Sequence, residues 1–222
     1  MSVRDSQPRA QAQTVAQAPE QAHETAPVGP IVISRHGRPA LDRRAGPRLT
    51  WRDYCDWWER YEAGGLAEGQ EIPGKLQAQV ADADIVLSSA RLRAQQTAAL
   101  AAPHLEAESD PVFNEAPLPP PRLPGLRYLP KTWNVLARAA WLNGHALDGE
   151  SVMQARERAA RAAARLHEAS RRGKVYLAAH GWFNRMIRPE LRTLGWRCVE
   201  DHGDSYWCYR VYEFRSQARS VG

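Results

Sequence analysis

Two histidines far apart in the chain stand in the same local setting. His36 and His180 each follow a short apolar run, and a glycine follows each of them, Gly37 and Gly181. An imidazole changes its charge near neutral pH and serves as a nucleophile or as a general acid–base group. A glycine lets a ligand or another backbone approach where a side chain would block it. If the two apolar runs are neighbouring strands, the two imidazoles face each other across one pocket.

Arginines accompany these histidines. Arg35 precedes His36, and Arg91 and Arg93 follow a third apolar run that ends in Ser88-Ser89. A lone histidine after a strand is more often structural, and a lone arginine is usually solvated or paired with an acid. The whole set favours a pocket for a dianionic phosphoryl group, because guanidinium groups bind phosphate oxygens in bidentate fashion.

Alternating strands and helices must position these residues. Strands that alternate with helices predict an α/β fold with a mostly parallel sheet covered on both faces. Ligands of such sheets bind beyond the carboxyl ends of the strands, which is where both histidines stand. We expect strands at 31–33, 84–87, 112–113, 175–179 and, at an edge of the sheet, 206–214, and helices at 50–63, 91–102, 132–142, 151–171 and 183–194.

Length and composition indicate one folded domain. The chain has 222 residues, enough for a single α/β domain at 29–222. Residues 1–28 are rich in Gln, Ala, Pro and Glu, and we expect a disordered tail because such a segment buries too little surface to offset its ordering entropy. We also expect a cytoplasmic protein without a membrane segment, because the chain lacks a secretory signal and a long apolar run.

Charge and cysteine content exclude several classes of function. The formal net charge is +5, but no basic stripe is interleaved with aromatic residues, so we expect no nucleic-acid partner. A phosphorylated substrate, either a small molecule or a phosphoprotein, accounts for the same charge. The cysteines and the remaining histidines lack the spacing of metal ligands, so we expect neither a metal nor another cofactor. The sequence leaves the oligomeric state open.

Four motifs in order resemble the histidine phosphatase superfamily, which includes cofactor-dependent phosphoglycerate mutase. The first is Arg35-His36-Gly37, and the second is the segment 88–98 with its two serines, Arg93 and Thr97-Ala98. Gly149-Glu150-Ser151 precedes a long helix, and His180-Gly181 comes last. The order and the rough spacing agree over about residues 30–214. The resemblance implies a three-layer α/β/α, phosphoglycerate mutase-like fold.

The resemblance also implies a role for each motif residue. His36 would be the nucleophile that forms a phosphohistidine, while Arg35, Arg93 and His180 hold the phosphoryl oxygens, with Gly37 and Gly181 beside them. His36 must be neutral on its attacking nitrogen. We therefore expect its other ring nitrogen to donate to a backbone carbonyl near Gly37.

A general acid must protonate the leaving oxygen. One branch of the family has an aspartate directly after the second histidine, but this chain has Gly181 there. The other branch has a glutamate after the third strand, and Glu115 occupies that position. A proline-rich segment at 116–130 follows it, in place of the usual Gly-rich stretch with Trp and Glu. The alternative acid is Glu150.

The resemblance leaves three functions open. The region after Arg38 lacks the asparagine of the mutase pattern, so we favour a phosphatase over a mutase-type phosphotransferase. A non-catalytic phosphate-binding module is the third possibility. Arg38 and Arg185 could meet a second charged group of the substrate, and candidates for the mouth of the pocket are Trp133, Trp141, Trp182 and Phe183.

Overall fold

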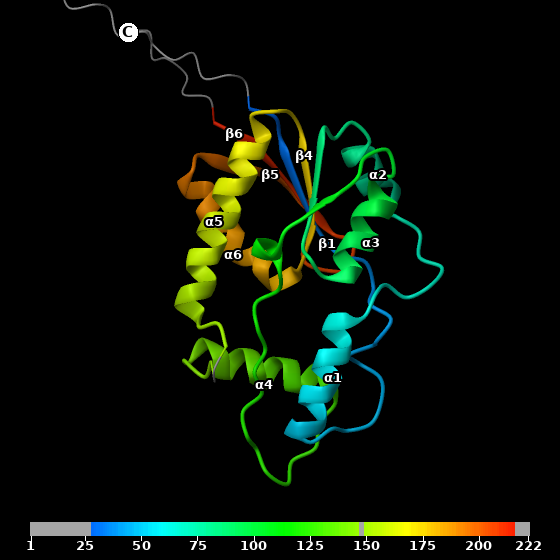
Figure 1. The fold of residues 1–222 in the computed structure, drawn as a ribbon, viewed down its shortest axis with the longest axis vertical. Coiled ribbons are helices and arrows are strands. Elements are labelled where there is room, and N and C mark those ends of the chain that lie inside the picture. Colours follow the sequence, from blue (N-terminus) through cyan, green and yellow to red (C-terminus); the bar gives the residue numbers. More distant parts are fainter. Residues whose placement is uncertain (1–27, 147–148, 216–222) are drawn as a thin grey trace, which may run out of the picture.

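A mixed sheet of six strands forms the centre of the protein (Figure 1). The computed structural model describes residues 28–146 and 149–215. The strand order is β3-β2-β4-β1-β6-β5. The strands β1 to β4 are parallel to one another, and β6 is antiparallel to both β1 and β5. The strands are β1 (Ile31–Arg35), β2 (Ile85–Ser88), β3 (Glu108–Ser109), β4 (Val175–Ala179), β5 (Trp196–Asp201) and β6 (Tyr209–Phe214).

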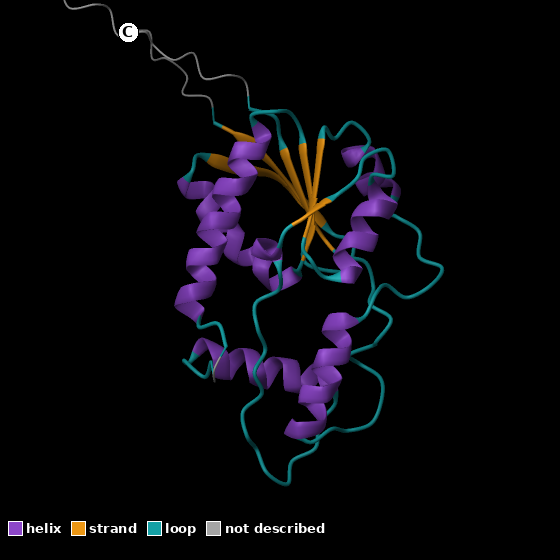
Figure 2. Ribbon diagram, viewed as in Figure 1, coloured by secondary structure: helices purple, strands orange, loops and turns teal. Residues whose placement is uncertain are grey.

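Helices cover both faces of this sheet (Figure 2). On one face lie α2 (Gly74–Val80) and α3 (Leu92–Ala101), and on the other lie α5 (Val152–Ser170) and α6 (Gly181–Thr193). This arrangement confirms the three-layer α/β/α fold. Two more helices, α1 (Trp51–Ala63) and α4 (Pro130–Leu142), lie together beyond the ends of the strands. They sit at the end of the molecule towards which β1 and β4 run.

The central strands β1, β2 and β4 begin with apolar runs because both of their sides are buried. On β1, Ile31 and Ile33 pack against α5 and α6, whereas Val32 between them packs in the core under α2 and α3. Successive side chains of a strand point to opposite faces, so one short run serves two cores. The short apolar runs at 31–33, 84–87 and 175–179 thus predict their strands correctly.

The α1–α4 pair has a separate aromatic core. Tyr54, Trp57 and Tyr61 of α1 are buried against Trp133 of α4. Thr50 begins α1 with a capping box, in which its hydroxyl accepts from the Asp53 backbone N–H. The pair therefore forms a stable wall facing the strand ends.

Two of the expected strands differ in the structure. Residues 111–113 form a 3-10 helix that starts at Pro111, and the third strand is the preceding pair Glu108–Ser109. The Asp110 carboxylate caps that turn by accepting from the Val112 N–H, which favours a turn over a strand. The expected edge strand is internal, because β6 lies between β1 and β5.

Two elements had no clear signal in the sequence. The strand β5 is mostly polar and exposed after Trp196, since it forms an edge of the sheet. The helix α2 is seven residues long, with Leu76 and Val80 as its buried residues. Neither shows enough hydrophobic periodicity to be recognised from a single sequence.

Candidate active site

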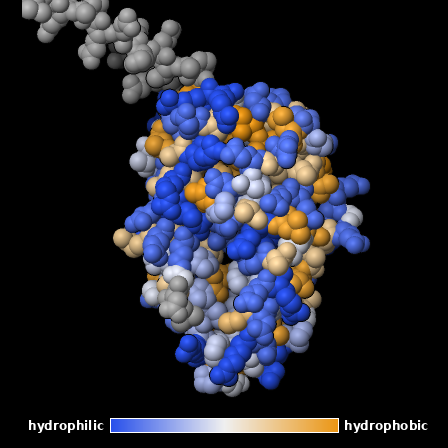
Figure 3. Space-filling model, in the orientation of Figure 1, coloured by the Kyte–Doolittle hydropathy of each residue, from blue (hydrophilic) through white to orange (hydrophobic). Residues whose placement is uncertain are grey.

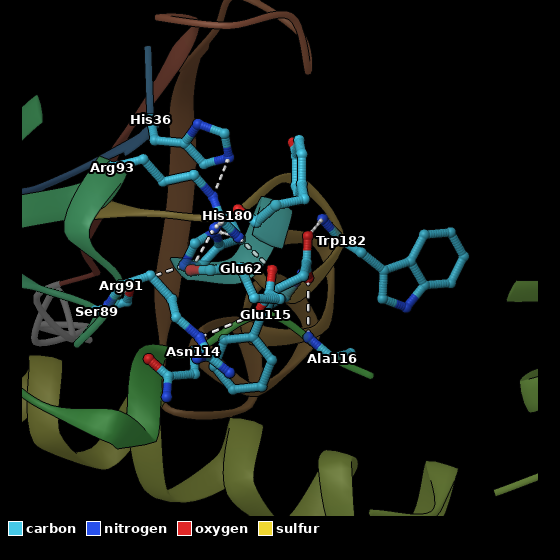
Figure 4. Close-up of polar contacts among 12 residues, drawn as sticks. His36, Glu62, Ser89, Arg91, Arg93, Asn114, Glu115, Ala116, His180 and Trp182 are labelled. Atoms are coloured by element: carbon cyan, nitrogen blue, oxygen red, sulfur yellow. Dashed lines mark hydrogen bonds and ion pairs between the residues drawn. The ribbon is translucent and has the colours of Figure 1, made fainter. Parts of the chain in front are cut away.

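The ends of β1, β2 and β4 bring two imidazoles and a hydroxyl together (Figure 4). His36 follows β1, His180 follows β4, and these strands are parallel neighbours. The ring centroids lie 5.1 Å apart at an interplanar angle of 63°. His36 is 2% exposed and His180 is fully buried. The sequence-based expectation that the two rings face each other is therefore confirmed.

The hydrogen bond of His36 defines its tautomer. Nδ1 lies 2.7 Å from the carbonyl oxygen of Gly37. A carbonyl oxygen can only accept, so Nδ1 carries the proton and Nε2 keeps its electron pair. Burial lowers the pKa of His36 well below its ordinary value, and the Arg93 and Arg35 guanidinium groups lower it further. The ring is therefore neutral at physiological pH, with the acceptor nitrogen turned inward.

His180 is held by the segment after β2. Its Nε2 lies 2.7 Å from the Ser89 hydroxyl, and its Nδ1 lies 3.4 Å from a terminal nitrogen of Arg93. Burial lowers the pKa of His180 well below its ordinary value, with Arg93 and His36 as further causes. The Ser89 hydroxyl also accepts from the Arg91 N–H, which fixes its place. The second imidazole thus has a set orientation as well.

Arg93 lies between the two histidines and is itself 1% exposed. Its Nε lies 3.3 Å from Nε2 of His36. One terminal nitrogen donates to the carbonyl oxygens of Tyr61 and Glu62, at 3.0 and 3.2 Å. The other donates to the Glu62 carboxylate at 2.6 Å. The three bonds to α1 hold the guanidinium in place, while its contacts with the two imidazoles are longer, at 3.3 and 3.4 Å.

Glu62 is a residue that sequence reasoning missed. Its carboxylate pairs with Arg93 and also lies 2.9 Å from Nε of Arg91. It stands in the last turn of α1, an element with no motif of its own. Its spacing from the histidines carries no signal, because the contact depends on how α1 packs.

Arg35 approaches the same point from β1. One terminal nitrogen donates to the Asp204 carbonyl oxygen at 2.7 Å, and the guanidinium lies 4.2 Å from the centre of the Tyr206 ring. The Nε of Arg35 is buried without a hydrogen-bond partner. A buried donor without an acceptor is costly, so this atom favours a ligand oxygen beside it. We call His36, His180, Arg35 and Arg93 the phosphoryl site.

Glu115 follows the 3-10 turn and reaches the start of α6. Its carboxylate accepts from the N–H groups of Phe183 at 2.9 Å, Ala116 at 3.0 Å and Trp182 at 3.2 Å. These bonds hold the side chain at the rim of the cavity that contains His36. The alternative acid is placed elsewhere. Glu150 makes a two-pronged ion pair with Arg158, at 2.7 Å for each contact, and does not line that cavity.

The two glycines of the motifs have different neighbours. A Cβ on Gly37 would lie 2.5 Å from the indole of Trp207, so this glycine makes room for a protein side chain rather than for a ligand. A Cβ on Gly181 would lie 3.1 Å from Nε of Arg35. Gly181 also lines the cavity, whereas Gly37 does not. Close approach to a ligand therefore fits Gly181, whereas the space beside Gly37 is filled by Trp207.

The family of the chain follows from its sequence match. Residues 31–221 match the model of the histidine phosphatase superfamily, branch 1. The chain belongs to the histidine phosphatase superfamily. Among curated proteins, none matches it in sequence.

Two solved structures, of a phosphatase and of a mutase, are similar to this one in fold. A phosphoserine phosphatase from Entamoeba histolytica, in complex with phosphoserine, is 14% identical with a TM-score of 0.52, over 84% of this chain and 91% of that one. A phosphoglycerate mutase from Bacillus anthracis str. Sterne is 16% identical with a TM-score of 0.51, over 86% and 93%. At these identities the likeness shows the fold, which is phosphoglycerate mutase-like as expected.

The histidine phosphatase cavity is large and cationic. It has a volume of about 1070 Å³ and extends from the phosphoryl site to α1 and α4. Among its lining residues, eight are Arg or Lys and three are Asp or Glu. Hydrophilic residues also predominate on the face shown in Figure 3, where apolar residues form small separate groups. Such a cavity suits an anionic ligand of small-molecule size.

The expected walls of the cavity are partly correct. Trp182, Arg38 and Arg185 line it. The other three aromatic candidates are core residues that do not line it, because Trp133 packs against α1, Trp141 lies under α5, and Phe183 packs on the sheet. Aromatic residues at helical spacing are core residues more often than ligand contacts.

Several polar residues of the cavity come from the loop after β1 and from α4 rather than from the strand ends. We call four of them the distal wall, and sequence reasoning missed them all because they belong to no motif. They are Arg43, Lys131, Asn134 and Arg138.

Two absences hold for the described part of the chain, residues 28–146 and 149–215. In that part no three His, Cys, Asp or Glu residues gather as a metal site would require. None of its helices is long and apolar enough to cross a membrane. The expected tail lies almost entirely outside the described residues.

Proposed function

We propose that this protein hydrolyses a phosphomonoester through a covalent phosphohistidine on His36. The state of His36 carries the proposal. Its ring is buried and neutral, Nδ1 donates to a carbonyl oxygen, and Nε2 presents an electron pair beside Arg93. A neutral imidazole nitrogen held in this way, with guanidinium groups around it, is what attack on a phosphorus atom requires.

In the first step Nε2 attacks the phosphorus of the bound ester. The N–P bond forms in line with the breaking P–O bond, and the leaving alkoxide takes up a proton. Arg35 and Arg93 donate to the equatorial oxygens, where the charge is spread in the transition state. The unpartnered Nε of Arg35 supports this role, since a phosphoryl oxygen would satisfy it.

Glu115 supplies the proton to the leaving oxygen. Its place in the lining of the cavity that contains His36 supports this assignment. An acid must lie within hydrogen-bond reach of the atom it protonates, and position comes before pKa in choosing a candidate.

In the second step water replaces the alcohol. Glu115, now a carboxylate, accepts a proton from the water as its oxygen attacks phosphorus. The P–N bond breaks, His36 recovers the electron pair on Nε2, and inorganic phosphate leaves. A phosphohistidine of a substrate protein would enter by the same route.

A mutase-type transfer is the second candidate, because a phosphatase and a mutase both occur on this fold. A mutase must keep its phosphohistidine from water while the intermediate turns round. The segment from Arg38 to Arg44 lacks the asparagine of the mutase pattern, and this observation favours hydrolysis.

The test is hydrolysis of p-nitrophenyl phosphate by the wild type and by His36→Ala, with EDTA present. We expect a fall in kcat of about a thousandfold or more, because the nucleophile is lost. Circular dichroism checks that the variant folds, and quenching of the wild type in alkaline SDS followed by alkaline gel analysis detects the phosphohistidine, which is stable to base. Equal activity in both proteins would refute the proposal. Transfer to an added alcohol in preference to water would favour the mutase-type alternative.

A further inference from the structure

Three of the four residues of the distal wall are cations. Lys131 and Arg138 lie on α4 with Asn134 between them, at a spacing that puts the three on one face of the helix. Arg43 stands on the loop after β1. Within residues 28–146 and 149–215, none of the three cations forms an ion pair.

The loop that carries Arg43 is joined to α4. The N–H of Lys131 donates to the carbonyl oxygen of Arg43 at 2.8 Å, so the two cations belong to one continuous surface. The guanidinium of Arg43 lies 5.7 Å from the centre of the Tyr206 ring. That ring also lies beside Arg35 and 5.6 Å from His36. The distal wall thus begins one aromatic ring away from the nucleophile.

Asn134 is buried with half of its amide unsatisfied. The side chain is 9% exposed, and its oxygen accepts from the Tyr54 hydroxyl at 3.0 Å. Its Nδ2 has no hydrogen-bond partner among the described residues, although the residue lines the cavity. A buried amide that lacks an acceptor is destabilising, and a ligand oxygen in the cavity would remove that cost.

Arg138 is held in place for the same surface. Its guanidinium lies 4.8 Å from the centres of the Trp141 and Trp182 rings and donates to the carbonyl oxygens of Ala116 and Pro117. Carbonyl oxygens and aromatic faces orient the group, and no carboxylate of the described residues lies within ion-pair distance of it. An anion in the cavity would compensate its charge.

We propose that the distal wall binds a second oxyanion of the substrate, so that the substrate is a small phosphomonoester with a carboxylate or a second phosphate. This inference rests on the proposed function, because it assumes that one phosphate occupies the phosphoryl site. Two cationic regions joined along a cavity of about 1070 Å³ suit a ligand with negative charge at both ends.

The test compares ligands that differ in the second group alone. Calorimetry on His36→Ala, which does not turn ligands over, measures 3-phosphoglycerate against glycerol 3-phosphate, and fructose 1,6-bisphosphate against fructose 6-phosphate. We expect the doubly anionic member of at least one pair to bind about tenfold tighter or more. The pair that shows the preference identifies carboxylate or phosphate. If His36→Ala does not fold, His36→Gln replaces it.

Matched variants locate the preference. In Lys131→Met and Arg43→Met we expect the preference to shrink about fivefold, because each removes one charge from the distal wall. Lys75→Met, at the equivalent position of α2, and Arg48→Met should keep it. Equal binding within both pairs, or an unchanged preference in both variants, would overturn the subsite. If hydrolysis of p-nitrophenyl phosphate depends on His36 but neither doubly anionic ligand binds more tightly, the subsite is refuted and the proposed function is not.

A second inference concerns the peptide group that follows Gly37. The carbonyl of Gly37 accepts from His36, and the N–H of the same peptide unit, on Arg38, donates to Oε1 of Gln70 at 2.6 Å. Gln70 in turn donates to the carbonyl oxygens of Arg38 and Ala67, at 2.7 and 2.8 Å. A peptide unit is planar, so fixing its N–H fixes its carbonyl.

Trp207 completes this support. Its indole N–H donates to Oε1 of Gln70 at 3.0 Å, and its ring fills the space beside Gly37. Its backbone has φ 64°, in the left-handed region that a tryptophan rarely adopts. Strain of this kind persists where the surroundings hold it, and such places cluster at functional sites.

We infer that Gln70 is a positioning residue for the nucleophile, acting through the Gly37–Arg38 peptide on the tautomer of His36. The test is Gln70→Leu, which removes both the acceptor and the donor of the side chain, with Gln77→Leu on the exposed side of α2 as the control. In Gln70→Leu we expect kcat to fall about tenfold with little change in KM. Nitrogen-15 NMR of the His36 ring should show a mixture of tautomers. Gln77→Leu should leave both readings unchanged.

A folded Gln70→Leu with a single wild-type tautomer would overturn this inference. The NMR reading does not depend on turnover, so it separates this failure from a failure of the proposed reaction.

Discussion

The phosphoryl site and the distal wall are both cationic, but they are built in opposite ways. In the phosphoryl site the protein itself satisfies most polar groups, through the Gly37 carbonyl, the Ser89 hydroxyl and the Glu62 carboxylate. In the distal wall the cations lie on a loop and a helix face without a carboxylate within ion-pair distance, as far as the described residues show.

This difference separates positioning from selection. Groups that transfer a phosphoryl group must stay in one geometry, so their partners are parts of the fold. Cationic groups that select a substrate can lack a carboxylate partner in the protein, because the bound anionic substrate becomes that partner. Substitutions in the two regions should therefore differ in their effects, which range from a large loss of kcat to a small change in stability.

Glu115 stands at the border of the two regions, and Glu115→Gln should have the largest effect. An amide cannot supply a proton, so we expect kcat for alkyl phosphates to fall by about a hundredfold or more. Hydrolysis of p-nitrophenyl phosphate should fall much less, because nitrophenolate leaves without a proton. Steady-state kinetics on both substrates measures the contrast.

Glu150→Gln is the matched control, since Glu150 is paired with Arg158 and stands apart from the cavity lining. It should show no dependence on the leaving group. Equal losses on both substrates in Glu115→Gln would mean that another group is the acid and that Glu115 belongs with the distal wall.

The same contrast explains how far the sequence alone could lead. The motif residues His36, His180 and Arg93 follow buried strands, and short apolar runs with helices between them identify those strands. Parallel neighbours then bring their ends together without further information. The phosphoryl site was therefore predictable as a group, although its glycines had roles that depend on Trp207 and Arg35.

The distal wall was not predictable in this way. Arg43 and Arg138 reach the cavity because the α1–α4 pair packs across the strand ends, and that packing depends on an aromatic core far from any motif. Similarly, β5 and α2 are short or polar elements whose place is decided by their neighbours. Local patterns carry information about buried regular elements and little about irregular surfaces.

A substitution of Glu62 tests whether the phosphoryl site depends on the ion pair that holds Arg93. In Glu62→Gln the charge beside Arg93 is lost, but the Tyr61 and Glu62 carbonyl oxygens still hold the guanidinium. We therefore expect a moderate fall in kcat, about tenfold, and no weakening of inhibition by inorganic phosphate. Glu59→Gln, on the exposed side of α1, is the control. Weaker phosphate inhibition with kcat unchanged would make Glu62 a binding group rather than a support.

The smallest effect concerns pH and stability. Burial, with Arg93 beside both rings, lowers the pKa values of His36 and His180 well below the ordinary value. The unfolded chain takes up these protons below about pH 6.5 and the folded chain does not. The free energy of unfolding should thus be full above that pH and fall as the pH decreases towards the lowered pKa values. The aspartates whose pKa values the fold lowers, such as Asp201 and Asp204, titrate in a more acidic range.

Melting temperatures between pH 7.5 and 5.5 measure this loss, at about 1.4 kcal/mol per pH unit for each histidine at its steepest. For each histidine, that corresponds to a fall in melting temperature of about 3 °C per pH unit in a domain of this size. In His180→Asn the slope should be about half as steep, because one of the two buried rings is gone. Lys131→Met should keep the wild-type slope, since the distal wall has no group that titrates in this range. If Lys131→Met changed the slope of melting temperature against pH and His180→Asn did not, the pH dependence would belong to the distal wall and not to the phosphoryl site.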